Sequence, residues 1–323
     1  MTNIVIDYIK KVTNGENLSE EESSRAFQIV MSGGATQAQI SALLVGLKMK
    51  GETVDEMVGA AKVMRAKASA FKAPEGCIDT CGTGGDGLST LNISTAVAFV
   101  VAACGVRVAK HGNKAASSKS GSADVLEALG VNINADTSVM EEALRHRNLC
   151  YLQATKYHTA MRHVAPLRQE LQIRTLFNII GPLSNPAKPD FQLLGVYDES
   201  LMEPMANVLN GLGVKRAWVV HGDDGMDELT ITGSSSVVQL DNGELSSFKV
   251  NPEEFGLTIC NIDDISGGDV GYNASELKML LLNQRNEPYL NIVLLNAAAC
   301  LVIAQKCDDL AQGVDMAREA LAS

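Results

Sequence analysis

From Pro74 onward, short apolar runs of strand character alternate with helical segments, and this alternation constrains the fold more than any other feature of the chain. Strands that alternate with helices are typical of a mostly parallel sheet joined by crossover helices. We therefore expect an α/β fold with a mostly parallel central sheet. Its expected strands are Cys77–Thr80, Val106–Lys110, Leu193–Val196, Ala217–Val220 and Ser236–Leu240. Its expected helices include Ser94–Cys104, Ala123–Leu129, Ser138–Arg145, Leu201–Leu212 and Leu290–Gln305.

The N-terminal part of the chain has a different character, with few β-branched runs. Three capping boxes precede apolar residues at helical spacing, namely Ser19 with Glu22, Thr36 with Gln39, and Thr53 with Glu56. We expect a small helical domain over residues 1–72 and a larger α/β domain over residues 73–323. Residues from about 156 to 180 are again helical in pattern, and we expect them to pack back onto the helical domain.

Composition excludes several classes of protein. No apolar run reaches the roughly 20 residues that a membrane-spanning helix needs, and the N-terminus lacks the basic start of a secretory signal. The seven cysteines form no CxxC pair, which favours reduced thiols in a cytoplasmic protein. A net charge of −11 disfavours a general nucleic-acid or membrane-surface partner, while leaving room for a small anionic ligand.

A glycine-rich segment follows the first expected strand. Residues 82–87 read Gly-Thr-Gly-Gly-Asp-Gly, and Asn92 to Thr95 then open an apolar helix. Glycines let backbone N–H groups approach phosphate oxygens closely, and a helix N-terminus attracts anions. The segment therefore predicts a phosphate-binding loop.

Gly82, Gly84 and Gly87 also match the G-x-G-x-x-G pattern of dinucleotide-binding folds, which is weak by itself. That fold places an acidic residue about 20 positions later to bind the ribose hydroxyls. No Asp or Glu occurs between Leu88 and Ala123. A Walker A loop is excluded because Leu88, not lysine, follows Gly87. We therefore disfavour an NAD-dependent dehydrogenase.

A second anion-binding loop is expected over residues 110–122, between a strand and a helix. The surrounding acid-free span carries four basic residues in an otherwise acidic chain: Arg107, Lys110, Lys114 and Lys119. Two such loops in one α/β domain fit a ligand with more than one phosphate group. A flexible, solvated basic loop is the alternative.

An acidic loop follows the expected strand at 217–220 and carries Asp223, Asp224, Asp227 and Glu228. Carboxylates at the end of a strand suit Mg²⁺, which prefers oxygen ligands and often bridges protein to substrate phosphates. From spacing alone, an ordinary solvated turn is an equal alternative. The two phosphate-type loops favour the metal site.

Together these segments resemble the anthranilate phosphoribosyltransferase family. The matching stretches run in order over nearly the whole chain: Gly82–Asp86, Asn92–Thr95, Lys110–Asn113, Ser117–Asp124, Arg174–Leu183 and Asp227–Glu228. The resemblance implies a helical N-terminal domain, an α/β domain of the nucleoside phosphorylase and phosphoribosyltransferase type, and a homodimer. It also implies transfer of the phosphoribosyl group of phosphoribosyl pyrophosphate to anthranilate, a step of tryptophan biosynthesis.

The resemblance further assigns residues to each ligand. Those implied to bind phosphoribosyl pyrophosphate are Gly82, Gly85, Asp86, Thr90, Asn92, Ile93, Ser94, Thr95, Lys110, His111, Gly112, Asn113, Lys114, Ala115, Ala116, Ser117, Ser118 and Ser122. Those implied to hold Mg²⁺, two ions per subunit, are Ser94, Asp227 and Glu228. Anthranilate would contact Gly82, Asn113 and Arg168. The alternative for Arg168 is a helix-surface ion pair with an acid such as Glu170.

The chain departs from the family pattern before the run Ala160-Met-Arg-His163. The family usually carries a Phe-Ala-Pro-like and a His-His-Pro-like stretch there, whereas this chain has Tyr151-Leu-Gln-Ala-Thr155 and Tyr157-His-Thr159. These segments lie near the acceptor path in relatives. The departure therefore concerns acceptor recognition more than phosphoribosyl chemistry.

Two other functions are compatible with parts of the sequence. A pyrimidine nucleoside phosphorylase-like enzyme shares the two-domain architecture and also attacks an anomeric carbon, but it has little need for a metal at Asp227 and Glu228. A non-catalytic relative that binds nucleic acid would show a basic face and lose the acidic pair. The net charge and the acidic pair both weigh against that relative.

Overall fold

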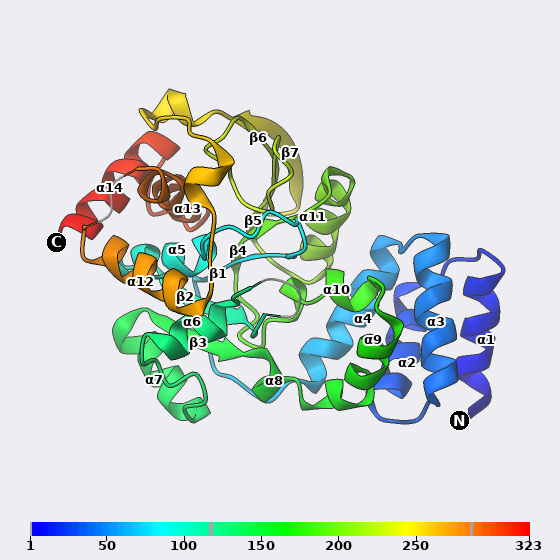
Figure 1. Ribbon diagram of the computed structural model, residues 1–323. Coiled ribbons are helices and arrows are strands. Elements are labelled where there is room, and N and C mark those ends of the chain that lie inside the picture. The colour runs from blue at the N-terminus through cyan, green and yellow to red at the C-terminus, as the bar shows by residue number, and fades with distance from the viewer. Residues whose placement is uncertain (1, 116–118, 285–286) are drawn as a thin grey trace.

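The computed structural model describes residues 2–115, 119–284 and 287–323. Figure 1 shows a group of N-terminal helices at one end of the molecule and, beside it, a sheet with helices on both faces. The expected fold class, a small helical part and a larger α/β part with a mostly parallel sheet, is confirmed. None of the described helices combines the length and the apolar character that crossing a membrane requires.

The helical part consists of α1 (Thr2–Thr13), α2 (Glu20–Met31), α3 (Gln37–Lys50) and α4 (Val54–Lys67). All three expected capping boxes are present, at Ser19, Thr36 and Thr53. In each box a hydroxyl accepts the N3 amide and the N3 side chain accepts the N-cap amide, so two otherwise unpaired donors are satisfied. Local sequence therefore decides where these three helices begin.

One seven-stranded sheet forms the centre of the α/β part, in the order β3-β2-β1-β4-β5-β6-β7. The strands are β1 (Cys77–Gly82), β2 (Arg107–Gly112), β3 (Leu149–Gln153), β4 (Phe191–Gly195), β5 (Arg216–Gly222), β6 (Ser235–Asp241) and β7 (Glu244–Val250). Pairing from β3 through β5 is parallel, and β6 and β7 add an antiparallel hairpin. From β1 the chain adds β2 and then β3 on one side of the sheet, and it then adds β4 and β5 on the other side of β1. The strand order therefore reverses between β1 and β4.

Helices cover both faces of the sheet. One face packs against α5 (Ile93–Ala103) and α13 (Tyr289–Ile303), and α12 (Val270–Leu281) and α14 (Leu310–Ala322) lie in the same, largest hydrophobic cluster. The other face packs against α7 (Thr137–Arg147) and α11 (Met202–Gly211), and α4 packs on α11. The short α6 (Ser122–Ala128) and the 3-10 turns η3 (Glu199–Leu201), η4 (Pro252–Phe255) and η5 (Ile262–Ile265) complete this part.

Residues 154–184, which include the segment of helical pattern expected near 156–180, form a series of short helical pieces. They are α8 (Ala154–Tyr157), η1 (Thr159–His163), α9 (Ala165–Leu171), α10 (Leu176–Ile179) and η2 (Pro182–Ser184). Val164, Leu167 and Phe177 are buried in the same hydrophobic cluster as α2, α3 and α4, and Figure 1 shows α9 beside those helices. The segment thus joins the helical part to the sheet.

The sequence pattern missed two strands, β3 and β7. β3 follows α7 after a single residue, Asn148, whose left-handed φ of 56° ends the helix without Gly or Pro as a signal. β7 is an edge strand that is exposed along most of its length, so it lacks the apolar alternation by which strands are recognised. The helices α12 and α14 were also not among those expected.

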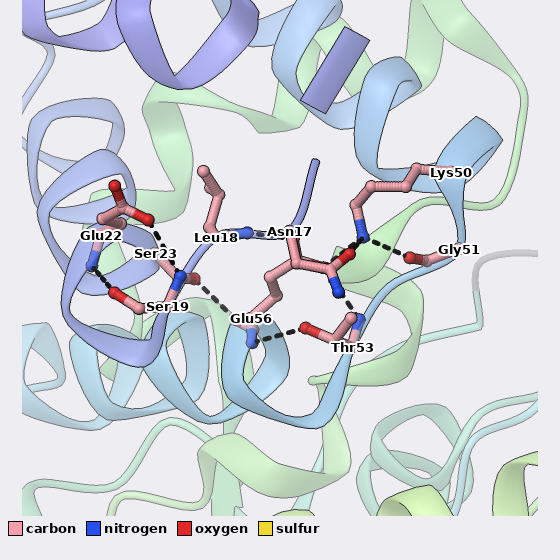
Figure 2. A network of polar contacts seen from close by, with 9 residues as sticks. All are labelled: Asn17, Leu18, Ser19, Glu22, Ser23, Lys50, Gly51, Thr53 and Glu56. Atoms are coloured by element: carbon pink, nitrogen blue, oxygen red, sulfur yellow. Dashed lines mark hydrogen bonds and ion pairs between the residues drawn. The ribbon is translucent and has the colours of Figure 1, made fainter. Parts of the chain in front are cut away.

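A buried carboxylate fastens the helical part together (Figure 2). The Glu56 carboxylate accepts hydrogen bonds from the backbone N–H of Leu18 at 2.8 Å and of Thr53 at 2.8 Å, and from Lys50 Nζ at 3.0 Å. The Glu56 side chain is fully buried, and that of Lys50 is 7% exposed. One side chain therefore ties the start of α4 to the end of α3 and to the segment before α2.

We expect Glu56→Gln to lower the free energy of unfolding by about 3 kcal/mol, because it leaves a buried ammonium without its counter-charge. The measurement is urea unfolding followed by circular dichroism. Glu22→Gln is the matched control, since Glu22 also closes a capping box and pairs with a lysine, but lies 31% exposed. The control change should cost below about 1 kcal/mol. Equal losses would show that burial of Glu56 has no special weight.

Candidate active site

The loops singled out by sequence converge at the carboxyl ends of the parallel strands. The strands β1, β2, β4 and β5 end at Gly82, Gly112, Gly195 and Gly222, and the glycine-rich, lysine-rich and acidic loops begin there. In open α/β sheets, ligands bind at this edge, where the strand order reverses. Here that point lies between β1 and β4.

The acidic loop sits directly on the ends of these two strands. A Cβ on Gly82 would overlap the Asp227 carboxylate, and a Cβ on Gly195 would overlap the Asp227 main chain. Gly84 N donates to Asp227 Oδ2 at 2.6 Å, which joins the acidic loop to the glycine loop. The two glycines therefore allow an approach that any side chain would block.

Asp227 and Glu228 are held near Asp86 with little positive charge to compensate. Desolvation, and then the negative charge of Asp86, raise the pKa of Asp227 above the usual range of an aspartate. Desolvation and then the charge of Asp227 likewise raise the pKa of Glu228, which Lys110 partly opposes. Such a cluster favours a bound cation, which would stabilise the ionised carboxylates.

The oxygen atoms of Asp227, Glu228 and Ser94 fit Mg²⁺, which takes oxygen ligands. Ser94 contributes a hydroxyl, and its backbone bonds to Glu228. Among the described residues, no set of three His, Cys, Asp or Glu side chains is arranged to enclose a metal ion. A magnesium ion held here would therefore take further ligands from a substrate or from water.

Lys110 is the cation at the centre of the site. Its side chain points from β2 across β1, where Nζ donates to the carbonyl of Thr80 at 2.7 Å and to Ser94 Oγ at 3.1 Å. The residue is 4% exposed. The carboxylate of Asp79 interacts electrostatically with Lys110. It accepts hydrogen bonds from His111 N at 3.2 Å and from Asn185 Nδ2 at 2.8 Å. Burial raises the pKa of Asp79 to about 6.

The glycine loop leads to the N-terminus of α5. Gly84, Gly85 and Gly87 have φ values of 70°, 82° and 81°, a region that disfavours other residues. Asn92 precedes α5 without a side-chain cap bond. Ile93 and Thr95 are buried at 2% exposure each, so they face the core and only their backbone amides are available to a ligand. Ser94, between them, faces the site.

The segment that contains Ser266 and Gly267 contacts the residues that follow the glycine loop. Thr90 forms an antiparallel bridge with Ser266, and Gly267 N donates to the carbonyl of Ser89 at 2.8 Å. Asn273 then joins Asn92 Oδ1 at 2.9 Å and Ser120 Oγ at 3.3 Å. The glycine loop and the lysine loop therefore share one buried anchor, which the sequence pattern did not indicate.

The lysine loop is only partly described, because Ala116, Ser117 and Ser118 lie outside the described residues. Asp124 accepts the amides of Ala115 at 2.9 Å and Gly121 at 3.0 Å, which closes the loop onto α6. Lys114 Nζ pairs with Glu127 at 2.8 Å on the surface. Ser122 Oγ lies 3.0 Å from the hydroxyl of Tyr151.

A second group of polar residues adjoins the lysine loop on the side of residues 151–175. The rings of His111 and His158 meet edge to face at 5.1 Å, and burial lowers their pKa values to about 3 and about 4, so both are neutral. Arg168 on α9 is half-buried, and desolvation lowers its pKa. No ion pair joins Arg168 to Glu170 or to another residue of the described ranges.

Arg174 links this group to the glycine loop, a role that sequence reasoning did not assign. Its guanidinium donates to the carbonyl of Gly85 and lies over the ring of Tyr197 at 4.0 Å from the centroid. Tyr197 N in turn donates to Thr83 Oγ1 at 3.2 Å. In the sequence, the only indication of this role is that Arg174 begins one of the stretches that resemble the family, Arg174–Leu183.

Comparison with known proteins identifies the family of the chain. Residues 74–323 match the α/β domain model of a glycosyl transferase family, and residues 6–68 match the helical bundle domain model of that family. The chain is 52% identical over 315 residues to the anthranilate phosphoribosyltransferase of Paramagnetospirillum magneticum, covering 98% of this chain and 91% of the relative. It belongs to the anthranilate phosphoribosyltransferase family.

Solved structures of anthranilate phosphoribosyltransferases have the same fold. The enzyme from Thermus thermophilus superposes with a TM-score of 0.93 at 42% identity, covering 98% of this chain and 95% of that one. The enzyme from Saccharomyces cerevisiae, solved in complex with phosphoribosyl pyrophosphate and Mg, superposes with a TM-score of 0.89 at 25% identity, covering 98% and 93%. The family match spans both parts of the chain.

We expect Gly195→Ala to lower the free energy of unfolding by about 2 kcal/mol or more, because its Cβ would overlap main-chain atoms that cannot rotate away. Chemical denaturation measures the loss. Gly233→Ala is the matched control: it lies in the loop before β6, has no positive φ, and its Cβ would meet nothing within 4 Å. That change should stay within about 0.5 kcal/mol. A Gly195→Ala protein as stable as the control would contradict the close approach.

Proposed function

We propose that this chain transfers the phosphoribosyl group of phosphoribosyl pyrophosphate to the amine of anthranilate and releases diphosphate, within tryptophan biosynthesis. The observation that carries the proposal is the meeting of three loops at the reversal between β1 and β4. The glycine loop, the lysine loop, the half-buried Asp227 and the buried Glu228 lie around one lysine, Lys110. Backbone amides and a cation suit phosphates, and paired carboxylates suit the metal that accompanies a diphosphate.

Phosphoribosyl pyrophosphate would occupy the glycine and lysine loops. We assign its contacts to three groups of residues. The first is Gly82, Gly85, Asp86 and Thr90, the second is Asn92 to Thr95, and the third is Lys110 to Ser118 together with Ser122. Burial of the Ile93 and Thr95 side chains limits them to backbone contacts. Lys114 would leave Glu127, to which it is bound by an exposed ion pair of little strength.

Magnesium is proposed on Ser94, Asp227 and Glu228, with two ions per subunit. The raised pKa values of both carboxylates and the magnesium complex of the Saccharomyces cerevisiae enzyme support a cation here. When bound, it supplies positive charge that neutralises the departing diphosphate.

The protein's part in the reaction is positioning and charge stabilisation. As the bond between the anomeric carbon and diphosphate breaks, positive charge develops on the ribose and negative charge on the leaving group. Lys110 and the loop amides stabilise the leaving group. The aromatic amine is neutral at pH 7 with an available lone pair, so it needs no strong base before attack. The low pKa values of His111 and His158 keep both rings neutral beside the lysine loop.

Anthranilate would lie beside Gly82, Asn113 and Arg168. Arg168 has no carboxylate partner among the described residues, which supports pairing with the carboxylate of the acceptor. The partial burial of its guanidinium strengthens such a pair. The two substrates thus meet at the ends of β1 and β2, with the acceptor on the side of α9.

The remaining assignments concern the whole protein. We propose that residues 1–72 form a helical domain and residues 73–323 the phosphoribosyl-binding domain, with the helices near 156–180 packed on the former. We further propose that the protein is a cytoplasmic homodimer that acts on small molecules and binds neither nucleic acid nor membranes. The family resemblance supports the dimer, and the net charge of −11 supports the absence of nucleic-acid binding.

The proposal is tested by incubating the purified chain with phosphoribosyl pyrophosphate, anthranilate and Mg²⁺. We expect anthranilate fluorescence to decay and diphosphate to appear in equal amounts, and chelation of the metal to stop both. A chain that leaves anthranilate unchanged but cleaves pyrimidine nucleosides with inorganic phosphate would overturn the assignment. Substituted benzoates should be assayed too, because the 151–159 segment departs from the family pattern.

We expect Asp227→Asn to lower turnover by roughly a hundredfold, the scale of losing one electrostatic contact to the leaving group. The amide keeps an oxygen for Gly84 N and removes the charge that repels Asp86 and Glu228, so the unfolding temperature should not fall. Steady-state kinetics at several Mg²⁺ concentrations, with thermal unfolding, measure both effects.

Asp223→Asn is the matched control for this change. Asp223 lies in the same loop, but its carboxylate is 47% exposed and pairs with Lys249 on the surface. Turnover and magnesium dependence should match the unaltered protein. If both variants keep full turnover, Asp227 has no part in the reaction.

A further inference from the structure

Gln153, in the segment that departs from the family pattern, is hydrogen-bonded to Asn113 of the lysine loop. Gln153 ends β3 and lies in register with Gly112, the residue before Asn113. Its side-chain Nε2 donates to Asn113 Oδ1 at 3.3 Å and to Thr155 Oγ1 at 3.3 Å. The residue is 4% exposed, whereas Asn113 is exposed.

The hydrogen bonds fix which way both amides face. The backbone N–H of Lys114 can only donate, and it lies 2.9 Å from the Asn113 side chain, so the atom that it meets is the oxygen. An oxygen at that position requires the NH₂ group of Gln153 opposite to it. The Nδ2 group of Asn113 is therefore turned away from both partners and is free to donate to a ligand.

This arrangement leaves the carbonyl of Gln153 without a partner. Gln153 Oε1 is buried and accepts no hydrogen bond within the described part of the chain. A buried unpaired carbonyl costs free energy, which an apolar side chain of similar size would avoid. The stability of the fold alone therefore does not explain glutamine at the end of β3.

We propose that Gln153 is a positioning residue for the acceptor, which holds the amide of Asn113 so that Nδ2 donates to anthranilate. The inference rests on the proposed function, in which Asn113 contacts anthranilate. Gln153 does not touch the substrates in this role. It acts through Asn113, and the unpaired Oε1 is the consequence of placing its NH₂ group toward Asn113 Oδ1.

The test is Gln153→Met, which keeps the length of the side chain and removes both amide groups. We expect the KM for anthranilate to rise roughly five- to tenfold, the scale of one hydrogen bond. The change releases only the side-chain amide of Asn113, while Asp124 still holds the backbone of the lysine loop. The KM for phosphoribosyl pyrophosphate and the kcat at saturating anthranilate should therefore stay near those of the unaltered protein. The unfolding temperature should be unchanged or higher, because the unpaired carbonyl is gone. A lower unfolding temperature, or a rise in both KM values, would assign Gln153 a purely structural role and overturn the proposal.

Thr155→Ala is the matched control, since it removes the other partner of Gln153 Nε2 and leaves the bond to Asn113 in place. Its KM for anthranilate should be unchanged. In an Asn113→Ala background, Gln153→Met should have no further effect on the KM for anthranilate, because both changes remove the same contact. Independent effects of the two changes would contradict action through Asn113. If the unaltered protein transfers no phosphoribosyl group, the proposed function itself has failed, which separates the two outcomes.

Discussion

The seating of the Asp227 main chain on Gly82 and Gly195 is the contact on which the rest of the site depends. It brings the loop after β5 over the ends of β1 and β4, so that carboxylates, the glycine loop and Lys110 share one place. A side chain at either glycine would displace the acidic loop. The position of Asp227 and Glu228 relative to the amides of the glycine loop is thereby set by backbone packing, not by flexible side chains.

Charge at the site is arranged for binding at the expense of stability. The charge of Asp86 repels the desolvated carboxylates of Asp227 and Glu228, and Asp79 is fully buried near Lys110. These groups would be more stable apart or neutral. They lie where the proposed magnesium and diphosphate would balance the charge. The buried Oε1 of Gln153 likewise costs stability, and we propose that it does so for the sake of acceptor binding.

The proposed acceptor side depends on residues 154–184, which also contact both parts of the molecule. Val164 and Leu167 are buried among the N-terminal helices, while Arg174 reaches the glycine loop at Gly85. The packing of the helical part therefore affects the position of Arg168. The carboxylate of Glu56 stabilises that part by a few hydrogen bonds far from the chemistry. Fold stability and acceptor position are linked through this one segment.

The sequence by itself determined the helix starts at Ser19, Thr36 and Thr53 and most of the parallel strands that lead into the glycine and lysine loops. These features are local, because capping, alternation and glycine conformation depend on neighbours a few residues apart. Only the tertiary structure decided that Asp227 rests on Gly195, that Asn273 anchors two loops, and that Gln153 faces Asn113. The edge strand β7 and the unmarked strand β3 belong to the same group. Each of these features depends on residues that are distant in the chain, and the periodicity of a local sequence carries no information about such residues.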